Sequence, residues 1–245
     1  MSNIRTFLAG AGTMAAALAA IMTLTGAKGP ANHARFDEIT VGRINIEEPD
    51  GTKRLIIANR AQFPGAFEQG KEIARPDRRD FAGMLFIDEE GNENGGLIQK
   101  GSKDTQGKIN AGLSLTFDRY RQDQALQLMH NTAGERVTTQ IRINDVPHHE
   151  KTAIFGGMEE YQKEAAKLPE SERNAYYKKL VEEGRIGNNR INLGMTPGNS
   201  SALTLKDKQG RPRMMLMVSP EGNALIQMFD EKGKVVKSIT PDSAP

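Results

Sequence analysis

The sequence predicts a mainly β protein built from antiparallel hairpins, with a helical insertion around residues 157–184 and a hydrophobic helix at the N-terminus. Three observations lead to this prediction. Apolar and polar residues alternate through much of the chain, Gly-containing turn signatures separate the alternating runs, and one internal segment is rich in Glu, Lys and Ala. Alternation with a period of two is typical of strands that bury one face.

The N-terminal residues 1–28 differ in character from the rest of the chain. Arg5 is followed by an uncharged stretch from Thr6 to Ala27 that is rich in Ala, Gly and Thr. As a helix this stretch would span the ~30 Å hydrocarbon core of a bilayer, so we expect the membrane to be a partner through residues 6–27. It fits either an uncleaved transmembrane anchor or a signal peptide that ends in small residues at Thr25-Gly26-Ala27.

Both interpretations direct the protein to the cell envelope. Arg5 precedes the apolar stretch and Lys28 and Arg35 follow it, so the flanking charges set the orientation only weakly. We expect a membrane-anchored protein with an extracytoplasmic body or, alternatively, one secreted after signal cleavage. Residues 29–35 are predicted to be a linker, residues 36–240 the β-rich body and residues 241–245 a tail.

The predicted body carries no formal charge excess. Residues 1–28 contain Arg5, Lys28 and no acidic residue, which leaves 31 basic residues against 31 acidic ones. Nucleic-acid binding depends on clustered Lys and Arg that neutralise phosphates, so we expect no nucleic-acid partner. The chain has no Cys, which excludes disulfides and thiolate metal ligands.

A strand–turn–strand pattern recurs along the body. Ile44 and Ile46 alternate with polar residues, the turn Glu48-Pro-Asp-Gly51 follows, and Leu55–Ala58 forms a second run. Similar four-residue turns, in which an acidic residue or Ser comes first and Gly comes fourth, occur at Asp88–Gly91, Asp207–Gly210, Ser219–Gly222 and Asp230–Gly233. Asp can accept a backbone hydrogen bond in such a turn, and Gly adopts its left-handed conformation. The turns near the C-terminus predict a β-meander, whereas the wide spacing of the early ones argues against a regular solenoid or propeller.

The segment from Gly157 to Glu183 interrupts the β pattern. Leu168-Pro169 lies in its middle, so we predict one helix that ends near Lys167 and a second that runs from Pro169 to Glu183. The helices separate two β portions, roughly residues 36–150 and 186–240. The sequence leaves open whether these portions share one sheet or form two domains.

Two groups of polar residues are candidate functional sites. The oxygen-rich segment Asp88–Gly96 contains Asp88, Glu90, Asn92 and Asn94, which could hold a cation such as Ca²⁺, although the spacing is not that of an EF-hand loop. The preferred interpretation is an exposed acidic turn. Asp118 and Asp123 could act with Glu93 as the acid and base of glycoside hydrolysis. A mixed-charge connection between strands explains the two Asp residues equally well.

Motifs of common enzyme classes are missing from the sequence. There is no Gly-x-Ser-x-Gly, no phosphate-binding Gly-x-x-x-x-Gly-Lys-Ser/Thr and no Gly-x-Gly-x-x-Gly, so we expect no cofactor. We therefore expect a non-enzymatic cell-envelope protein whose β domain has a structural or binding role, with an unknown envelope partner and with oligomers possible. The alternative is an envelope carbohydrate hydrolase that uses the carboxylates named above.

Several sequence strings resemble a family of uncharacterised bacterial proteins that carry an N-terminal membrane or signal segment. The strings lie at Phe36–Gly51, Ala82–Ile98, Leu113–Gln124 and Leu203–Val236, so the resemblance covers most of residues 36–236. The resemblance implies a shared β-rich fold. It implies no activity, ligand or catalytic residue.

Overall fold

The computed structural model describes residues 33–149, 157–196 and 198–242, so the predicted N-terminal helix lies outside the described residues. The chain divides into two compact units, Met1–Thr40 and Val41–Pro245. In the first unit, the described residues 33–40 contain no helix or strand. All the helices and strands described below belong to the second unit.

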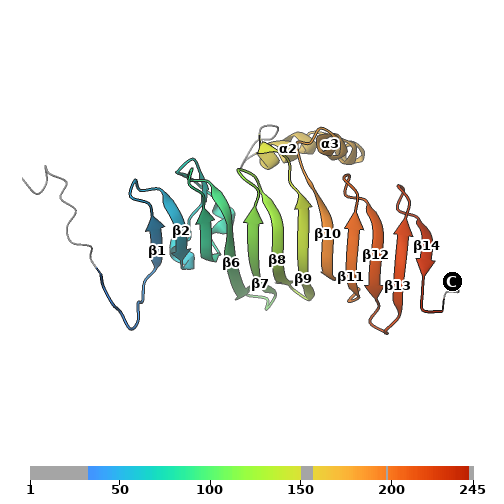
Figure 1. The fold of residues 1–245 in the computed structure, drawn as a ribbon, viewed down its shortest axis with the longest axis horizontal. Helices are drawn as coiled ribbons and strands as arrows, with labels where there is room; N and C mark the ends of the chain where they lie inside the picture. Colours follow the sequence, from blue (N-terminus) through green and yellow to red (C-terminus); the bar gives the residue numbers. More distant parts are fainter. Residues whose placement is uncertain (1–32, 150–156, 197, 243–245) are drawn as a thin grey trace, which may run out of the picture. The chain divides into compact units, whose positions relative to one another are not determined.

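One antiparallel sheet of twelve strands dominates the second unit (Figure 1). The prediction of a mainly β protein with antiparallel hairpins is confirmed. The strands, in their order across the sheet, are β1 (Arg43–Glu47), β2 (Lys53–Ala58), β5 (Ala82–Ile87), β6 (Glu93–Lys103), β7 (Ile109–Asp118), β8 (Gln124–Ala133), β9 (Arg136–Asp145), β10 (Asn188–Met195), β11 (Ser201–Lys206), β12 (Pro212–Val218), β13 (Ala224–Phe229) and β14 (Val235–Ile239).

The predicted Gly-containing turns join successive strands. In the turn between β5 and β6, the Gly91 amide donates to the carbonyl oxygen of Asp88 at 3.1 Å, and Asp88 Oδ1 accepts from the amide of Glu90 at 3.0 Å. Gly91 has φ +79°, a conformation that costs other residues free energy. A turn of the same type at Asp104–Gly107 joins β6 to β7 and was not among the predicted turns.

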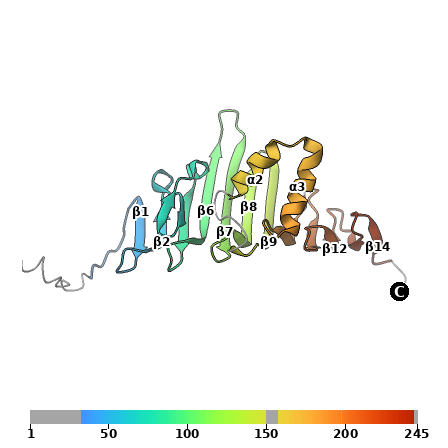
Figure 2. The ribbon, with the colours of Figure 1, turned by 90° about the horizontal axis from the view of Figure 1, so that it is seen from above.

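The helical insertion is also confirmed. Helix α2 spans Gly157–Ala166 and helix α3 spans Glu170–Glu182, with Pro169 at the N-cap of α3. The two helices lie in the chain between β9 and β10 (Figure 1; Figure 2 shows the helices from above), yet these strands pair directly, with Ile141 opposite Leu193. The β portions before and after the helices therefore form one sheet.

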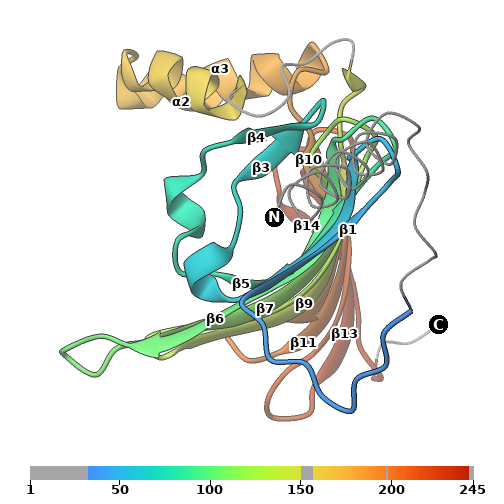
Figure 3. The same cartoon turned by 90° about the vertical axis from the view of Figure 1, so that its left-hand side faces the viewer.

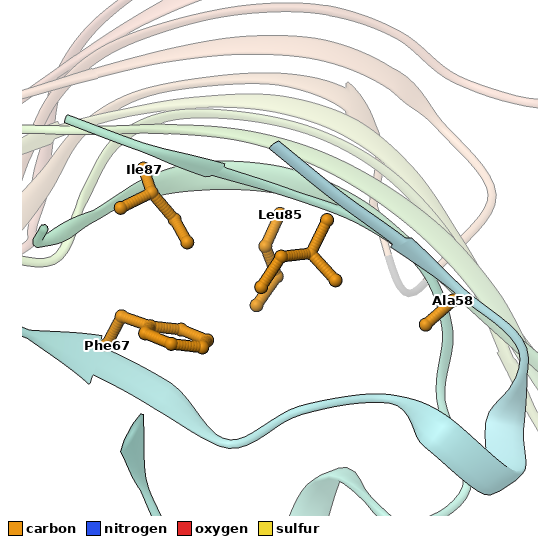
Figure 4. Packing of buried hydrophobic residues seen from close by; sticks show 5 residues of the cluster. Ala58, Phe67, Leu85 and Ile87 are labelled. Carbon is orange, nitrogen blue, oxygen red and sulfur yellow. The ribbon is translucent and has the colours of Figure 1, made fainter. Parts of the chain in front are cut away.

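The segment between β2 and β5 folds over one face of the sheet (Figure 3). It contains the 3₁₀ turns η1 (Arg60–Gln62) and η2 (Pro76–Arg78) and the two-stranded sheet of β3 (Ala66–Glu68) and β4 (Lys71–Ile73). Phe67 of β3 packs against Ile56, Ala58, Leu85 and Ile87 of the large sheet, and all five are buried (Figure 4). This segment, called the covering segment below, provides the hydrophobic core at this end of the sheet.

Candidate functional site

The registers of the twelve strands align one apolar residue from every strand. Partners opposite each other in antiparallel strands point to the same face, so these residues form one continuous line. We call it the apolar row: Ile44, Ile57, Met84, Leu97, Leu115, Leu128, Ile141, Leu193, Leu203, Leu216, Ile226 and Ile239.

A second row runs beside the first on the same face, two residues further along each strand. This flanking row consists of Ile46, Leu55, Phe86, Gly95, Phe117, Leu126, Ile143, Ile191, Leu205, Met214, Met228 and Lys237. Gly95 and Lys237 are its only members without a large apolar side chain. The face that carries both rows is called the apolar face.

Side chains on the apolar face are exposed to an unusual degree. Leu193 is 47% exposed, Phe117 47% and Leu128 37%. The large hydrophobic residues of β1 to β13 that are exposed all lie on this face: Ile44, Ile46, Ile57, Leu113, Phe117, Leu128, Val137, Ile141, Ile143, Leu193, Met195, Leu216 and Val218. Contiguous apolar patches are rare on the surfaces of monomeric proteins, and large ones are typical of interaction sites.

The opposite face has a different composition. The row that alternates with the apolar row is Asn45, Ile56, Leu85, Gly96, Thr116, Gln127, Arg142, Asn192, Thr204, Met215, Gln227 and Ser238. It is apolar at Ile56 and Leu85, where the covering segment buries it, and mostly polar from Thr116 onward. Along β7 to β14 this row is thus mostly polar, whereas the apolar row is apolar at every strand.

A groove of about 540 Å³ lies at the C-terminal end of the sheet, across β10 to β14. Its lining is mainly apolar and includes the last five members of the apolar row, Leu193, Leu203, Leu216, Ile226 and Ile239. The groove gives this part of the apolar face a concave surface that can receive protruding side chains.

A buried ion pair joins the covering segment to the large sheet. Arg78 Nη1 donates to Glu93 Oε2 at 2.9 Å, and Arg78 Nη2 donates to Glu93 Oε1 at 2.8 Å. Arg78 also donates to the carbonyl oxygen of Gly65 at 3.0 Å. The two side chains are 12% and 7% exposed, so the pair is shielded from water and from salt.

Asp118 lies within the electrostatic reach of the same ion pair. Burial, together with the nearby negative charges of Glu93 and Asp123, raises the pKa of its carboxyl to about 8, while the positive charge of Arg78 acts in the opposite direction. Asp118 Oδ1 is buried and accepts no hydrogen bond from the residues that the structure describes. At neutral pH the carboxyl of Asp118 is therefore largely protonated.

The three candidate catalytic carboxylates thus lie at the same end of three neighbouring interior strands. Glu93 begins β6, Asp118 ends β7, and Asp123 immediately precedes β8, so the antiparallel order brings them to the same end. Asp118 and Asp123 also flank the connection between two strands, as the other interpretation held. Both oxygens of Glu93 are held by Arg78, which limits the freedom of this carboxylate to act as a nucleophile.

The oxygen-rich turn has its polar atoms engaged with one another. Asn92 is 2% exposed; its Oδ1 accepts from the amide of Gln69 at 2.9 Å, and its Nδ2 donates to the carboxylates of Asp88 and Glu90. Asn94 is exposed on β6. Among the residues that the structure describes, no three His, Asp or Glu side chains are placed together so that they could hold a metal ion.

Residues 6–27, the predicted membrane contact, lie outside the described residues. Within the described ranges, none of the helices combines the length and the apolar character needed to cross a membrane. The membrane contact therefore stays a prediction from the sequence.

Comparison with known proteins yields no family assignment. No model of a protein family matches the chain, and no curated protein matches it. The roles of the apolar face and of the carboxylates Glu93, Asp118 and Asp123 are therefore argued from their geometry and chemistry alone.

Two features of the candidate site could not be predicted from the sequence. The alternation of Ile, Leu and Met predicted strands with one apolar side, but only the registers show that these sides align across all twelve strands. No sequence motif contains Arg78. Its pairing with Glu93, fifteen residues away in sequence, is a tertiary contact.

Proposed function

We propose that this protein is a non-enzymatic binding protein of the cell envelope whose β domain works through its apolar face. The observation that supports the proposal is the unbroken apolar row, whose exposed members include Leu128, Ile141 and Leu193. A sheet face that is in contact with water usually carries polar residues at such positions, as the row on the opposite face does from Thr116 onward except at Met215. Residues 1–28 are proposed to direct the domain to the envelope.

Photo-crosslinking tests the binding role of the face. A photoreactive amino acid is placed at Leu193, on the apolar face, or at Asn192, its neighbour on the opposite face, in the full chain expressed in cells. We expect a protein adduct at position 193 and none at position 192. Equal labelling at both positions, or no adduct at 193, would refute the proposed function.

The proposed location has a separate test. Cell fractionation followed by N-terminal sequencing distinguishes an anchor, with Arg5 retained in the membrane fraction, from a cleaved signal, with a mature protein that starts near Lys28. A full-length chain recovered entirely from the cytosol would contradict both forms of the proposal.

A second function, hydrolysis of envelope carbohydrate, is supported by Asp118. A carboxyl with a pKa of about 8 is protonated at neutral pH, as a general acid must be, and Asp123 would act as the base or nucleophile. The full chain should then release reducing ends from soluble glycans, and Asp118→Asn should abolish the release. An inactive wild-type chain would exclude this function without affecting the first.

A further inference from the structure

We propose that the partner of the apolar face is a second copy of this chain, which packs its own apolar face against the first. This inference rests on the proposed function, because it names the partner of the same surface. The apolar row is continuous from Ile44 at one edge of the sheet to Ile239 at the other. A surface that is uniformly apolar is complementary to itself, as a two-fold symmetric interface requires.

The size of the face suits such an interface. Twelve strands spaced about 4.8 Å apart give a length of about 58 Å, and two rows about 7 Å apart give a strip about 14 Å wide, or about 800 Å². A standard interface buries about 800 Å² on each partner. Strands in the sheet fan as its twist accumulates (Figure 3), so two copies cross and not all of the strip is used. If two-thirds of the strip on each copy were used, the interface would bury about 1,000 Å² in total, which is about the minimum for a biological interface.

The charge of the face also favours a second copy. The apolar row contains no charged residue, and the flanking row contains only Lys237, which lies in the edge strand β14. An anionic lipid surface or a charged protein would find little electrostatic complementarity on such a strip. Aliphatic side chains from an identical strip can fill the groove lined by Leu203, Leu216 and Ile226. Packing of this kind, with two sheets about 10 Å apart, is that of a β-sandwich.

The experiment combines the photoreactive residue at Leu193 with two differently tagged full-length copies in the same cells. We expect an adduct of twice the chain mass that carries both tags. An adduct with another protein alone would overturn this inference and leave the proposed function intact. The absence of any adduct would overturn both.

Two matched variants then connect the adduct to the face. Leu216→Lys places a charge in the apolar row at a side chain that is already 39% exposed, so the domain should fold. Gln227→Lys places the same charge on the opposite face of the neighbouring strand. We expect Leu216→Lys to reduce the doubly tagged adduct at least tenfold and Gln227→Lys to leave it unchanged.

Purified full-length chains provide the independent measurement. Light scattering should show a dimer for the wild type and for Gln227→Lys, and a monomer for Leu216→Lys, with equal circular dichroism in the three proteins. A dimer that survives Leu216→Lys would show that another segment, such as residues 6–27, drives association, and would overturn the inference. If the circular dichroism of Leu216→Lys differs from that of the wild type, the same measurement is made on Leu128→Lys instead. Leu128 lies on β8 and is 37% exposed.

Discussion

Arg78 binds both carboxylate oxygens of Glu93 through two nearly equal hydrogen bonds, 2.9 and 2.8 Å long. The first residue belongs to the covering segment and the second to β6, so the pair fastens that segment to the large sheet. The same guanidinium counteracts the negative charge that surrounds Asp118. The stability of the covering segment and the ionisation of Asp118 are therefore coupled through one side chain, that of Arg78.

Arg78→Ala should destabilise the protein by about 3–5 kcal/mol, because it leaves the buried carboxylate of Glu93 without its partner. The matched control is Arg75→Ala, which removes a more exposed pair with Asp77 and should cost less than about 1 kcal/mol. Denaturant unfolding measures both values. Equal losses for the two variants would contradict the structural role assigned to Arg78.

Asp118 should make the protein less stable as pH rises. Its pKa of about 8 in the folded state lies above the usual value of about 4 for an unfolded Asp, so the folded state binds the proton more tightly. Between about pH 4 and pH 8, Asp118 is ionised in the unfolded chain and protonated in the folded one, so folding takes up a proton. The contribution of Asp118 to the free energy of unfolding therefore falls by up to about 1.4 kcal/mol for each unit by which the pH rises.

Asp118→Asn removes that proton uptake. The free energy of unfolding of the variant minus that of the wild type should therefore increase as the pH is raised from 5 to 8. Denaturant midpoints at each pH unit provide the comparison, and other titrating groups cancel in the difference. Parallel curves for the two proteins would show that Asp118 does not titrate in this range.

Gly91→Ala should be more destabilising than Gly107→Ala, although the two glycines occupy equivalent turns with φ near +80°. A Cβ at Gly91 would lie 2.3 Å from the amide nitrogen of Gly70 in the covering segment, whereas nothing lies within 4 Å of a Cβ at Gly107. Gly107→Ala should cost about 1–2 kcal/mol from backbone strain alone. Gly91→Ala should cost a further 1–3 kcal/mol or so from the steric clash. Thermal unfolding of both variants tests the difference, and a cost no greater at Gly91 would contradict the close approach of the two turns.

Asn92→Ala should cost about 1–3 kcal/mol, because the Gln69 amide loses its acceptor and the carboxylates of Asp88 and Glu90 lose a shared donor. Asn94→Ala, two residues away and exposed, should change the free energy of unfolding by less than about 0.5 kcal/mol.

Calorimetric titration of the wild type with Ca²⁺ addresses the cation hypothesis directly. Heat of binding that disappears in both variants would favour a cation site over the hydrogen-bonded turn.

Much of the fold was predictable because its signals are local. The turn at Asp207–Gly210 depends on hydrogen bonds within a few residues, and Pro169 marks the start of α3 for a similar reason. The sheet β3–β4 escaped prediction because its strands are short and their burial depends on Phe67 reaching residues of other strands. The meander itself could be expected near the C-terminus, but its extension across the helices requires the pairing of Ile141 with Leu193.

The candidate site was predictable only in part. Glu93, Asp118 and Asp123 could be named as chemically suitable side chains, because carboxylates in acid–base chemistry are recognisable by type. Burial of Asp118 and the engagement of Glu93 by Arg78 depend on tertiary packing, which sequence spacing does not encode. The apolar face has the same origin, since a shift of register by one residue would send Leu128 or Leu193 to the opposite side of the sheet.

The meander has a consequence for how this domain folds and evolves. Apart from the covering segment, each strand of the large sheet bonds to strands that are adjacent in sequence, so most contacts close short loops and the contact order is low. Sheet formation can begin at any hairpin and spread outward, as in linear repeat proteins. Gain or loss of one hairpin between β10 and β14 would lengthen or shorten the sheet by two strands while the remaining registers stay intact. The length of the domain is thus a variable that can change in steps, independently of its core near β2 and β5.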